Sequence, residues 1–288
     1  MKKLLMIDGH SILNRAFYGI PLLTNSEGLY TNAVYGFLNI MFSVLEEEKP
    51  DYLAVAFDLS APTFRHKMYD AYKGTRKGMP EELRSQVPLI REMLTAMQIP
   101  ILTLEGFEAD DLLGTISLDA QEKGMLVTIL SGDRDLLQLA SETVCVRIPK
   151  TKQGRTEIED YFAKDVLERY LVTPDQIVEL KALMGDASDN IPGVPGIGEK
   201  TAQKIIAAYG DIENAYAHVD EIAPKRAQTA FREHYDLALL SRKLAKIDRH
   251  SPARLDYEAA EVSDPYTVEA LQLCRRLEFR NLLSRFEG

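Results

Sequence analysis

The sequence predicts an α/β protein, with a central and mostly parallel sheet flanked by helices and a helical part after it. Three observations predict this fold class. Short unbroken apolar runs alternate with segments of helical spacing in the first half of the chain. Acidic residues follow the end of each apolar run, and a glycine-rich loop joins two helical segments in the second half.

Four apolar runs are expected to form buried strands, at residues 4–7, 53–57, 101–104 and 127–130. A run that is apolar throughout, and does not alternate with polar residues, is typical of a strand covered on both faces. Helical spacing lies between these runs at residues 33–47, 81–97 and 112–123. Strand and helix that alternate in this way imply parallel pairing through right-handed crossovers.

The pattern changes beyond residue 148. Residues 150–155, which contain Gly154, are expected to form a turn between two short strands, and the chain after residue 159 is expected to be helical. Helices are predicted at residues 164–170, 174–184, 199–209 and 229–246. We therefore expect an α/β core at residues 1–158, with an arch at about residues 62–84, and a helical subdomain at residues 159–288.

The composition is that of a globular protein and excludes several other classes. The 288 residues include 34 Lys plus Arg against 44 Asp plus Glu, for a formal charge of −10. No apolar run approaches the roughly 20 residues of a membrane span, and the apolar start of the chain stops too soon, at Asp8, for an export signal. Two cysteines are too few for a disulfide framework or a zinc site. The two cysteines fit a reducing cytoplasm, and we expect a cytoplasmic protein; the resemblance described below implies a bacterial one.

Carboxylates follow all four predicted strands. Because ligands of such sheets bind outside the carboxyl ends of the strands, these acids are expected to converge on one edge. Their mutual repulsion calls for cations, and hard oxygen ligands favour Mg²⁺ or Mn²⁺. The alternative for any one of them is a turn former or a helix N-cap. The seven acids are Asp8, Asp58, Glu108, Asp110, Asp111, Asp133 and Asp135.

A glycine-rich loop is expected to bind phosphate. Gly193, Gly196 and Gly198 leave backbone N–H groups open at a helix start, and Lys200 follows within the first turn. A nucleotide-binding P-loop requires Lys directly after its last Gly, and Glu199 stands there instead. A plain turn between helices is the other alternative. Just upstream, Asp186 and Asp189 are spaced to face one way and extend the acid set to nine.

The predicted arch is basic and aromatic. Six basic residues stand against three acidic ones between residues 65 and 84, and residues 224–254 are also locally positive. Cations interleaved with tyrosines suit a single strand, whose phosphates they contact and whose bases they stack. The alternative is a solvated helical face. The residues expected to contact DNA here are Arg65, Lys67, Tyr69, Tyr72, Lys73, Arg76 and Lys77.

The order of these motifs resembles the 5′-nuclease (flap endonuclease) family over essentially the whole chain. The resemblance implies hydrolysis of DNA, or of RNA on DNA, where a 5′ single strand leaves a duplex, with a 5′-phosphate as product in primer removal and repair. The residues that carry it are Asp8, Asp58 with segment 64–76, segments 108–111 and 132–135, and segment 184–198.

The resemblance also assigns residue roles. It implies a first metal ion on Asp8, Asp58, Glu108, Asp110 and Asp111, and a second on Asp133, Asp135, Asp186 and Asp189, partly through waters. Lys73 and Arg76 are implied to engage the scissile phosphate, Tyr72 to stack on a base and Arg15 to reach the phosphate. The loop at residues 193–198 resembles the family's helix-three-turn-helix, which grips duplex backbone and commonly holds K⁺.

The expected mechanism is attack by metal-activated water, with a second ion at the leaving oxygen. No histidine is expected to act as a general base, and no Ser or Cys has the partner that covalent catalysis needs. A phosphotransfer receiver domain, an RNA-cleaving nuclease and a non-catalytic DNA-junction binder are the alternatives. We expect a monomer, which is either a freestanding nuclease or part of a larger enzyme.

Overall fold

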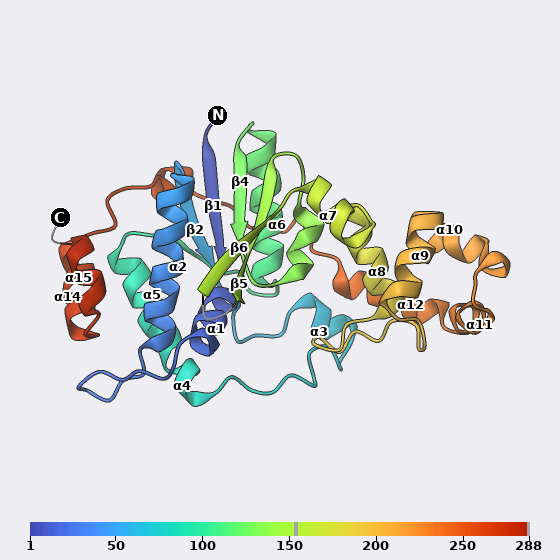
Figure 1. Cartoon of the computed structure of the whole chain (residues 1–288), viewed down its shortest axis with the longest axis horizontal. Helices are drawn as coiled ribbons and strands as arrows, with labels where there is room; N and C mark the ends of the chain where they lie inside the picture. The colour runs from blue at the N-terminus through green and yellow to red at the C-terminus, as the bar shows by residue number, and fades with distance from the viewer. Residues whose placement is uncertain (153–154, 287–288) are drawn as a thin grey trace.

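The computed structural model describes residues 1–152 and 155–286, so the turn expected around Gly154 lies outside the described residues. It contains one sheet in the order β3-β2-β1-β4-β5-β6, and the predicted fold class is confirmed (Figure 1). β1 to β5 are parallel, and β6 runs antiparallel to β5. The strands are β1 (Lys3–Asp8), β2 (Tyr52–Ala56), β3 (Ile101–Leu102), β4 (Leu126–Leu130), β5 (Val144–Lys152) and β6 (Arg155–Tyr161).

Both faces of the sheet are covered, which is why its strands are apolar throughout. Along β1, Leu4 and Met6 face one core, and Leu5 and Ile7 face the other. The first core lies under α6 (Ala109–Glu122) and the 3₁₀ helix η1 (Arg134–Leu139). The second lies under α1 (Gly9–Gly19), α2 (Asn32–Glu48) and α5 (Gln86–Ala96). The result is the three-layer arrangement of Figure 1.

Two predicted helices are each divided in the structure. The helix expected at residues 81–97 consists of α4 (Glu81–Arg84) and α5, separated at Ser85. Pro88 lacks the N–H that would bond to residue 84, so the ladder is interrupted there. The helix expected at residues 229–246 is α11 (Lys225–Glu233) and α12 (Tyr235–Ala245), which meet at His234. The arch carries the short helix α3 (Phe64–Met68).

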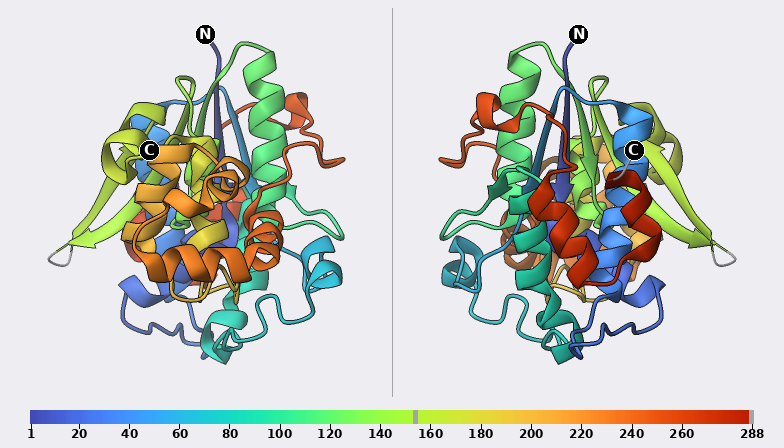
Figure 2. Two further views of the ribbon diagram at one scale, coloured as in Figure 1. Left: turned by 90° about the vertical axis from the view of Figure 1, so that its right-hand side faces the viewer. Right: turned by 90° about the vertical axis from the view of Figure 1, so that its left-hand side faces the viewer.

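The helical part lies at one end of the sheet (Figure 1). In chain order its elements are α7 (Ala163–Tyr170), η2 (Pro174–Gln176), α8 (Ile177–Met184), α9 (Glu199–Tyr209), α10 (Ile212–Ala217), η3 (Val219–Glu221), α11, α12 and α13 (Tyr257–Ala260). The chain then returns to the core, where α14 (Val268–Arg276) and α15 (Arg280–Phe286) join the second core (Figure 2). No helix in the described parts of the chain is long and apolar enough to span a membrane.

Candidate active site

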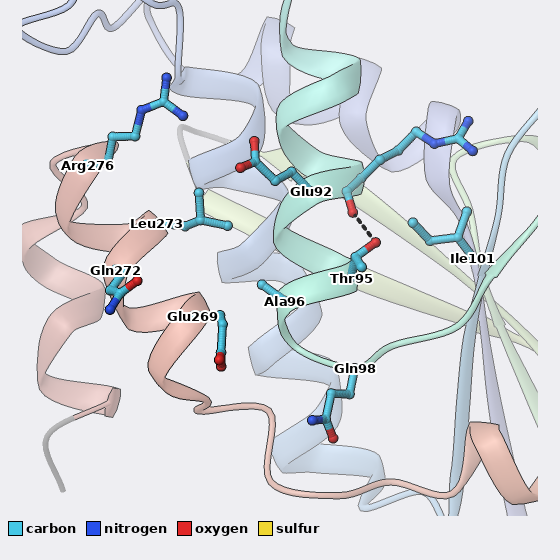
Figure 3. Close-up of a pocket in the computed structure, with 10 residues that line it drawn as sticks. Glu92, Thr95, Ala96, Gln98, Ile101, Glu269, Gln272, Leu273 and Arg276 are labelled. Carbon is cyan, nitrogen blue, oxygen red and sulfur yellow. Dashed lines mark hydrogen bonds between the residues drawn. The ribbon is translucent and has the colours of Figure 1, made fainter.

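The carboxyl ends of the strands surround a cavity of about 850 Å³. Asp8 from β1, Asp58 after β2, Glu108 and Asp110 at the start of α6, and Asp133 after β4 line it. Lys73 and Arg76 of the arch line the same cavity. A larger hollow of about 990 Å³ lies between α5 and α14, where none of the predicted site residues is found (Figure 3). Volume alone therefore does not identify the functional site.

Asp8 is held both as a helix cap and as a cavity residue. Its carboxylate accepts hydrogen bonds from the backbone N–H of Ser11 at 3.1 Å and from the hydroxyl of Ser131 at 2.7 Å. Burial raises the pKa of Asp8 to about 7, against the opposing effect of these two hydrogen bonds. The helix-cap role and the position in the cavity, which the sequence analysis treated as alternatives, therefore occur together in Asp8.

The other cavity acids repel one another. Burial, with the charges of Asp133, Asp8 and Asp58, raises the pKa of Asp110 well above its usual range. Asp58 accepts a hydrogen bond from the backbone N–H of Ala109 at 2.7 Å, and Asp133 caps η1. Among the described residues, no Lys or Arg forms an ion pair with any of these four aspartates. They carry an excess of negative charge that a divalent cation would relieve.

The structure corrects the roles expected for Arg65 and Asp111. Both nitrogens of the Arg65 guanidinium bond to Asp111 at 2.8 Å, and the side chains are 2% and 0% exposed. Arg65 also donates to the carbonyl oxygens of Leu244 and Lys246. Arg65 is thus a buried link between the arch and α12 and does not face DNA, and Asp111 has no free oxygen facing the cavity.

Lys73 and Arg76 approach the acids from the arch. Nζ of Lys73 lies 2.8 Å from Oε1 of Glu108, and Arg76 pairs with Asp189. Burial would lower the pKa of Lys73, but the charges of Glu108 and Asp189 outweigh it and raise the pKa. Glu108 and Asp189 are therefore paired with the chain's own cations, at the point where those cations also border the cavity.

Tyr72 does not present its ring for stacking in this structure. It is 3% exposed, and its hydroxyl donates toward Glu108 at 3.1 Å and Asp189 at 3.3 Å. Tyr69 packs beside it against Val178 and other apolar residues. The expected base-stacking surface is consequently part of the interface between the arch and the helical part. The reason is that burying these rings in the interface lowers the free energy more than exposing them on a solvated face would.

Asp135 and Asp186 share one lysine. Lys181 of α8 pairs with both carboxylates, and the three side chains are only 11–17% exposed. The two acids respond differently. Against the effect of burial, the hydrogen bonds from Lys181 and Ser188 lower the pKa of Asp186 to about 2, whereas burial and the charge of Asp133 raise that of Asp135 to about 7. We attribute the difference to the neighbours of the two acids, because Asp135 lies beside the charge of Asp133 whereas Asp186 accepts a further hydrogen bond from Ser188.

His10 and Lys181 are the functional candidates that the sequence interpretation missed. Nδ1 of His10 accepts a hydrogen bond from the backbone N–H of Asp58 at 3.3 Å, and the ring lines the acid cavity. Burial lowers the pKa of His10, so the neutral ring carries its proton on Nε2. His10 stands two residues after Asp8, within the first turn of α1, and this position was the available signal.

The glycine loop is closely packed at Gly193 and exposed at Gly196 and Gly198. Gly193 has φ +61°, and a Cβ there would lie 2.3 Å from the backbone nitrogen of Gly185. The N–H of Gly193 donates to Ser241 at 2.8 Å, so it is not available to a phosphate, contrary to expectation. Gly196, Gly198 and Lys200 are exposed. The guanidinium of Arg226 lies about 3.6 Å from the Cβ position of Gly196.

Arg15 lies outside the acid cavity. It lines an adjoining hollow of about 720 Å³ with Lys150, and the two hollows share Ser11, Asn14, Tyr18 and Gly132. This places a cation and an exposed aromatic ring next to the acids on the side where Lys150 lies. Any contact of Arg15 with a substrate would be made in this second hollow.

The acids are the right type of donor for a divalent cation, although their side chains are not arranged around one in this structure. Within residues 1–152 and 155–286, no group of three or more His, Cys, Asp or Glu side chains is arranged to hold a metal ion as it stands. The four unpaired aspartates nevertheless border one cavity, and burial together with the charges of the other three raises the pKa of Asp110. Hard oxygen donors with uncompensated charge are the donor set that Mg²⁺ and Mn²⁺ take.

The sheet with carboxylates at its carboxyl edge, and the helical part with its glycine loop, together define a 5′-nuclease fold. The chain belongs to the 5′-3′ exonuclease family. Residues 3–171 match the family's N-terminal resolvase-like domain, and residues 172–267 match its C-terminal SAM fold. The resemblance that the motifs indicated is confirmed.

Its relatives are bacterial DNA polymerases. DNA polymerase I of Bacillus caldotenax is 48% identical over 287 residues, or 100% of this chain, and that of Bacillus subtilis (strain 168) is 43% identical over 284 residues, or 99% of the chain. The chain spans 32% of the length of each.

Solved structures share the fold. T5 5′-exonuclease with bound divalent zinc superposes with a TM-score of 0.70 at 20% identity, covering 99% of this chain and 97% of that one. The catalytic core of Rad2 in complex with DNA substrate superposes with a TM-score of 0.58 at 16% identity, covering 98% and 88%.

Proposed function

We propose that the chain is a divalent-metal-dependent 5′-nuclease that hydrolyses DNA, or RNA paired with DNA, where a 5′ strand leaves a duplex. One observation carries the proposal most directly. Acids from separate strand ends and three cations of the arch, Lys73, Arg76 and Lys77, line a single cavity, so one phosphodiester can meet both. A junction-binding module would need the cations but not this set of acids.

In this proposal Asp8, Asp58, Asp110 and Asp133 hold Mg²⁺ or Mn²⁺. Glu108 would join them once Lys73 leaves it. Asp135, Asp186 and Asp189 would serve a second ion partly through waters together with Asp133, which is the grouping that the family resemblance implies. When bound, such ions activate water for in-line attack and stabilise the leaving oxygen. Lys73 and Arg76 neutralise charge on the scissile phosphate, for which they exchange their present partners Glu108 and Asp189.

The helical part is proposed to hold the duplex. Gly196, Gly198 and Lys200 are exposed at the start of α9, where the unpaired N–H groups and helix dipole favour a backbone phosphate. The loop at residues 193–198 is also proposed to hold K⁺. We propose that residues 1–158 carry the nuclease site and that residues 159–288 carry the duplex-binding part, although α14 and α15 of that part pack on the core. We also propose that the chain acts in the bacterial cytoplasm, where its DNA substrate would lie.

Three labelled substrates test the proposal: a 5′-flap duplex, a blunt duplex and a single strand, each with Mg²⁺ and with EDTA. We expect cutting at the flap junction that is lost in EDTA. Cutting that persists in EDTA would contradict the metal assignment. Tight flap binding without cutting in either Mg²⁺ or Mn²⁺ would leave a junction-binding module.

A further inference from the structure

Lys181 occupies an unusual position for a lysine. It lies in α8, where every residue from Ile177 to Leu183 is buried, and it is itself 9% exposed. A buried ammonium is costly unless it is neutralised by hydrogen-bonded carboxylates. Asp135 of η1 and Asp186 of the loop after α8 supply them, so three separate elements meet at one nitrogen.

The two acids at Lys181 are two of the four that the family resemblance assigns to a second metal ion. A single ammonium bonded to two carboxylates occupies the place between them that a cation would take. A divalent ion at contact distance from a fixed ammonium would be repelled by it. By contrast, Asp8, Asp58 and Asp133 form no ion pair with a Lys or Arg in the described part of the chain. The acids at this edge of the sheet therefore form two groups. Asp135 and Asp186 are paired with a cation of the chain itself, and Asp8, Asp58 and Asp133 are not.

We propose that Lys181 is a built-in counter-ion that takes the place of a divalent cation between Asp135 and Asp186 in the DNA-free protein. This inference rests on the proposed function, since it assumes that the acid edge binds divalent ions. It implies that ions bind first among the four unpaired aspartates. It also implies that a tightly held ion at Asp135 and Asp186 requires Lys181 to be displaced.

Calorimetric titration of the DNA-free protein with Mn²⁺ tests the inference, and thermal unfolding with and without Mn²⁺ gives a second readout. The variant is Lys181→Met, which keeps an unbranched side chain of nearly the same length and removes its charge. The matched control is Lys123→Met, because Lys123 pairs with Asp119 in an exposed position away from the cavity.

We expect Lys181→Met to bind one more Mn²⁺ per chain than the unaltered protein, or to bind its weakest ion about tenfold more tightly. We also expect Mn²⁺ to raise its melting temperature more, because the ion replaces the lost ammonium. Lys123→Met should match the unaltered protein. Equal ion number and affinity in Lys181→Met and the unaltered protein would overturn the inference and leave the proposed function standing.

Asp186→Asn, with Lys181 intact, covers the case in which Lys181→Met does not fold. If Lys181 neutralises this acid, Asp186→Asn should keep the number and affinity of bound Mn²⁺ ions. Loss of one ion would show that Asp186 already holds metal and would overturn the inference. Absence of Mn²⁺ binding in the unaltered protein would overturn both the inference and the proposed function.

Discussion

Arg65 and Asp111 form a buried ion pair in which two guanidinium nitrogens each lie 2.8 Å from a carboxylate oxygen. The arginine belongs to the arch and the aspartate to the first turn of α6, so the pair ties the arch to the core. Removing one partner of such a pair leaves an uncompensated buried charge. The pair is therefore a structural requirement of the arch.

We predict that Arg65→Ala lowers the free energy of unfolding by about 3–5 kcal/mol. Urea denaturation measures this change. Arg84→Ala is the control, because Arg84 pairs with Glu81 on the surface and its removal should cost less than about 1 kcal/mol. If Arg65→Ala is as stable as the control and only binds DNA less tightly, the original expectation of a phosphate contact would be restored.

Asp133→Asn is predicted to abolish cleavage while sparing flap binding. The change removes one charge from the cavity acids, and loss of a few kcal/mol of transition-state stabilisation lowers the rate by at least about a hundredfold. Single-turnover cleavage and a flap-binding titration measure the two effects separately. Asp236→Asn, an exposed acid at the start of α12, should cleave at the normal rate. A full rate in Asp133→Asn would contradict the site.

His10 is predicted to position Asp58 by accepting the hydrogen bond of its backbone N–H. His10→Ala leaves that donor unpaired, and we expect the Mg²⁺ concentration for half-maximal cleavage to rise about tenfold or more. His10→Asn keeps an acceptor near the position of Nδ1 and should recover most of the metal affinity. Equal Mg²⁺ requirements in His10→Ala and the unaltered protein would show that His10 has no positioning role.

Gly193→Ala is predicted to disrupt the glycine loop. Its φ of +61° costs a side chain about 1–2 kcal/mol, and the added Cβ would lie 2.3 Å from the nitrogen of Gly185. We expect a lower melting temperature together with weaker duplex binding. At Gly198, φ is −94° and no atom lies within 4 Å of the Cβ position, so Gly198→Ala should lose less than about 1 kcal/mol. Similar melting temperatures for both variants would contradict this distinction.

Much of the fold could be predicted because each element carries its own local signal. The apolar runs correspond to β1, β2, β3 and β4, and the helix predicted at residues 199–209 has the bounds of α9 (Glu199–Tyr209). Errors arose where tertiary context or a backbone detail decided. Pro88, in the first turn of α5, separates that helix from α4. The helix α1 begins directly after β1, and the periodicity of the sequence did not predict it.

The candidate site was predictable in its position but not in its pairings. That acids end consecutive strands is visible in the sequence, and parallel strands bring such ends together. Which cation meets which acid depends on contacts between distant residues. Arg65 meets Asp111 across 46 positions, and Arg76 meets Asp189 across 113. No local period encodes such a contact.

By itself, the sequence determined the strands, the edge at which the acids gather and the loop that only glycine can form. These features follow from burial, backbone sterics and the direction of parallel strands, which act on neighbours in the chain. The tertiary structure alone decided that Asp111 pairs with Arg65 and Asp186 with Lys181, and that within residues 1–152 and 155–286 no Lys or Arg pairs with Asp8 or Asp133. Electrostatic interaction depends on distance in space, so the division of the acids between internal cations and a metal ion is fixed only when the chain is folded.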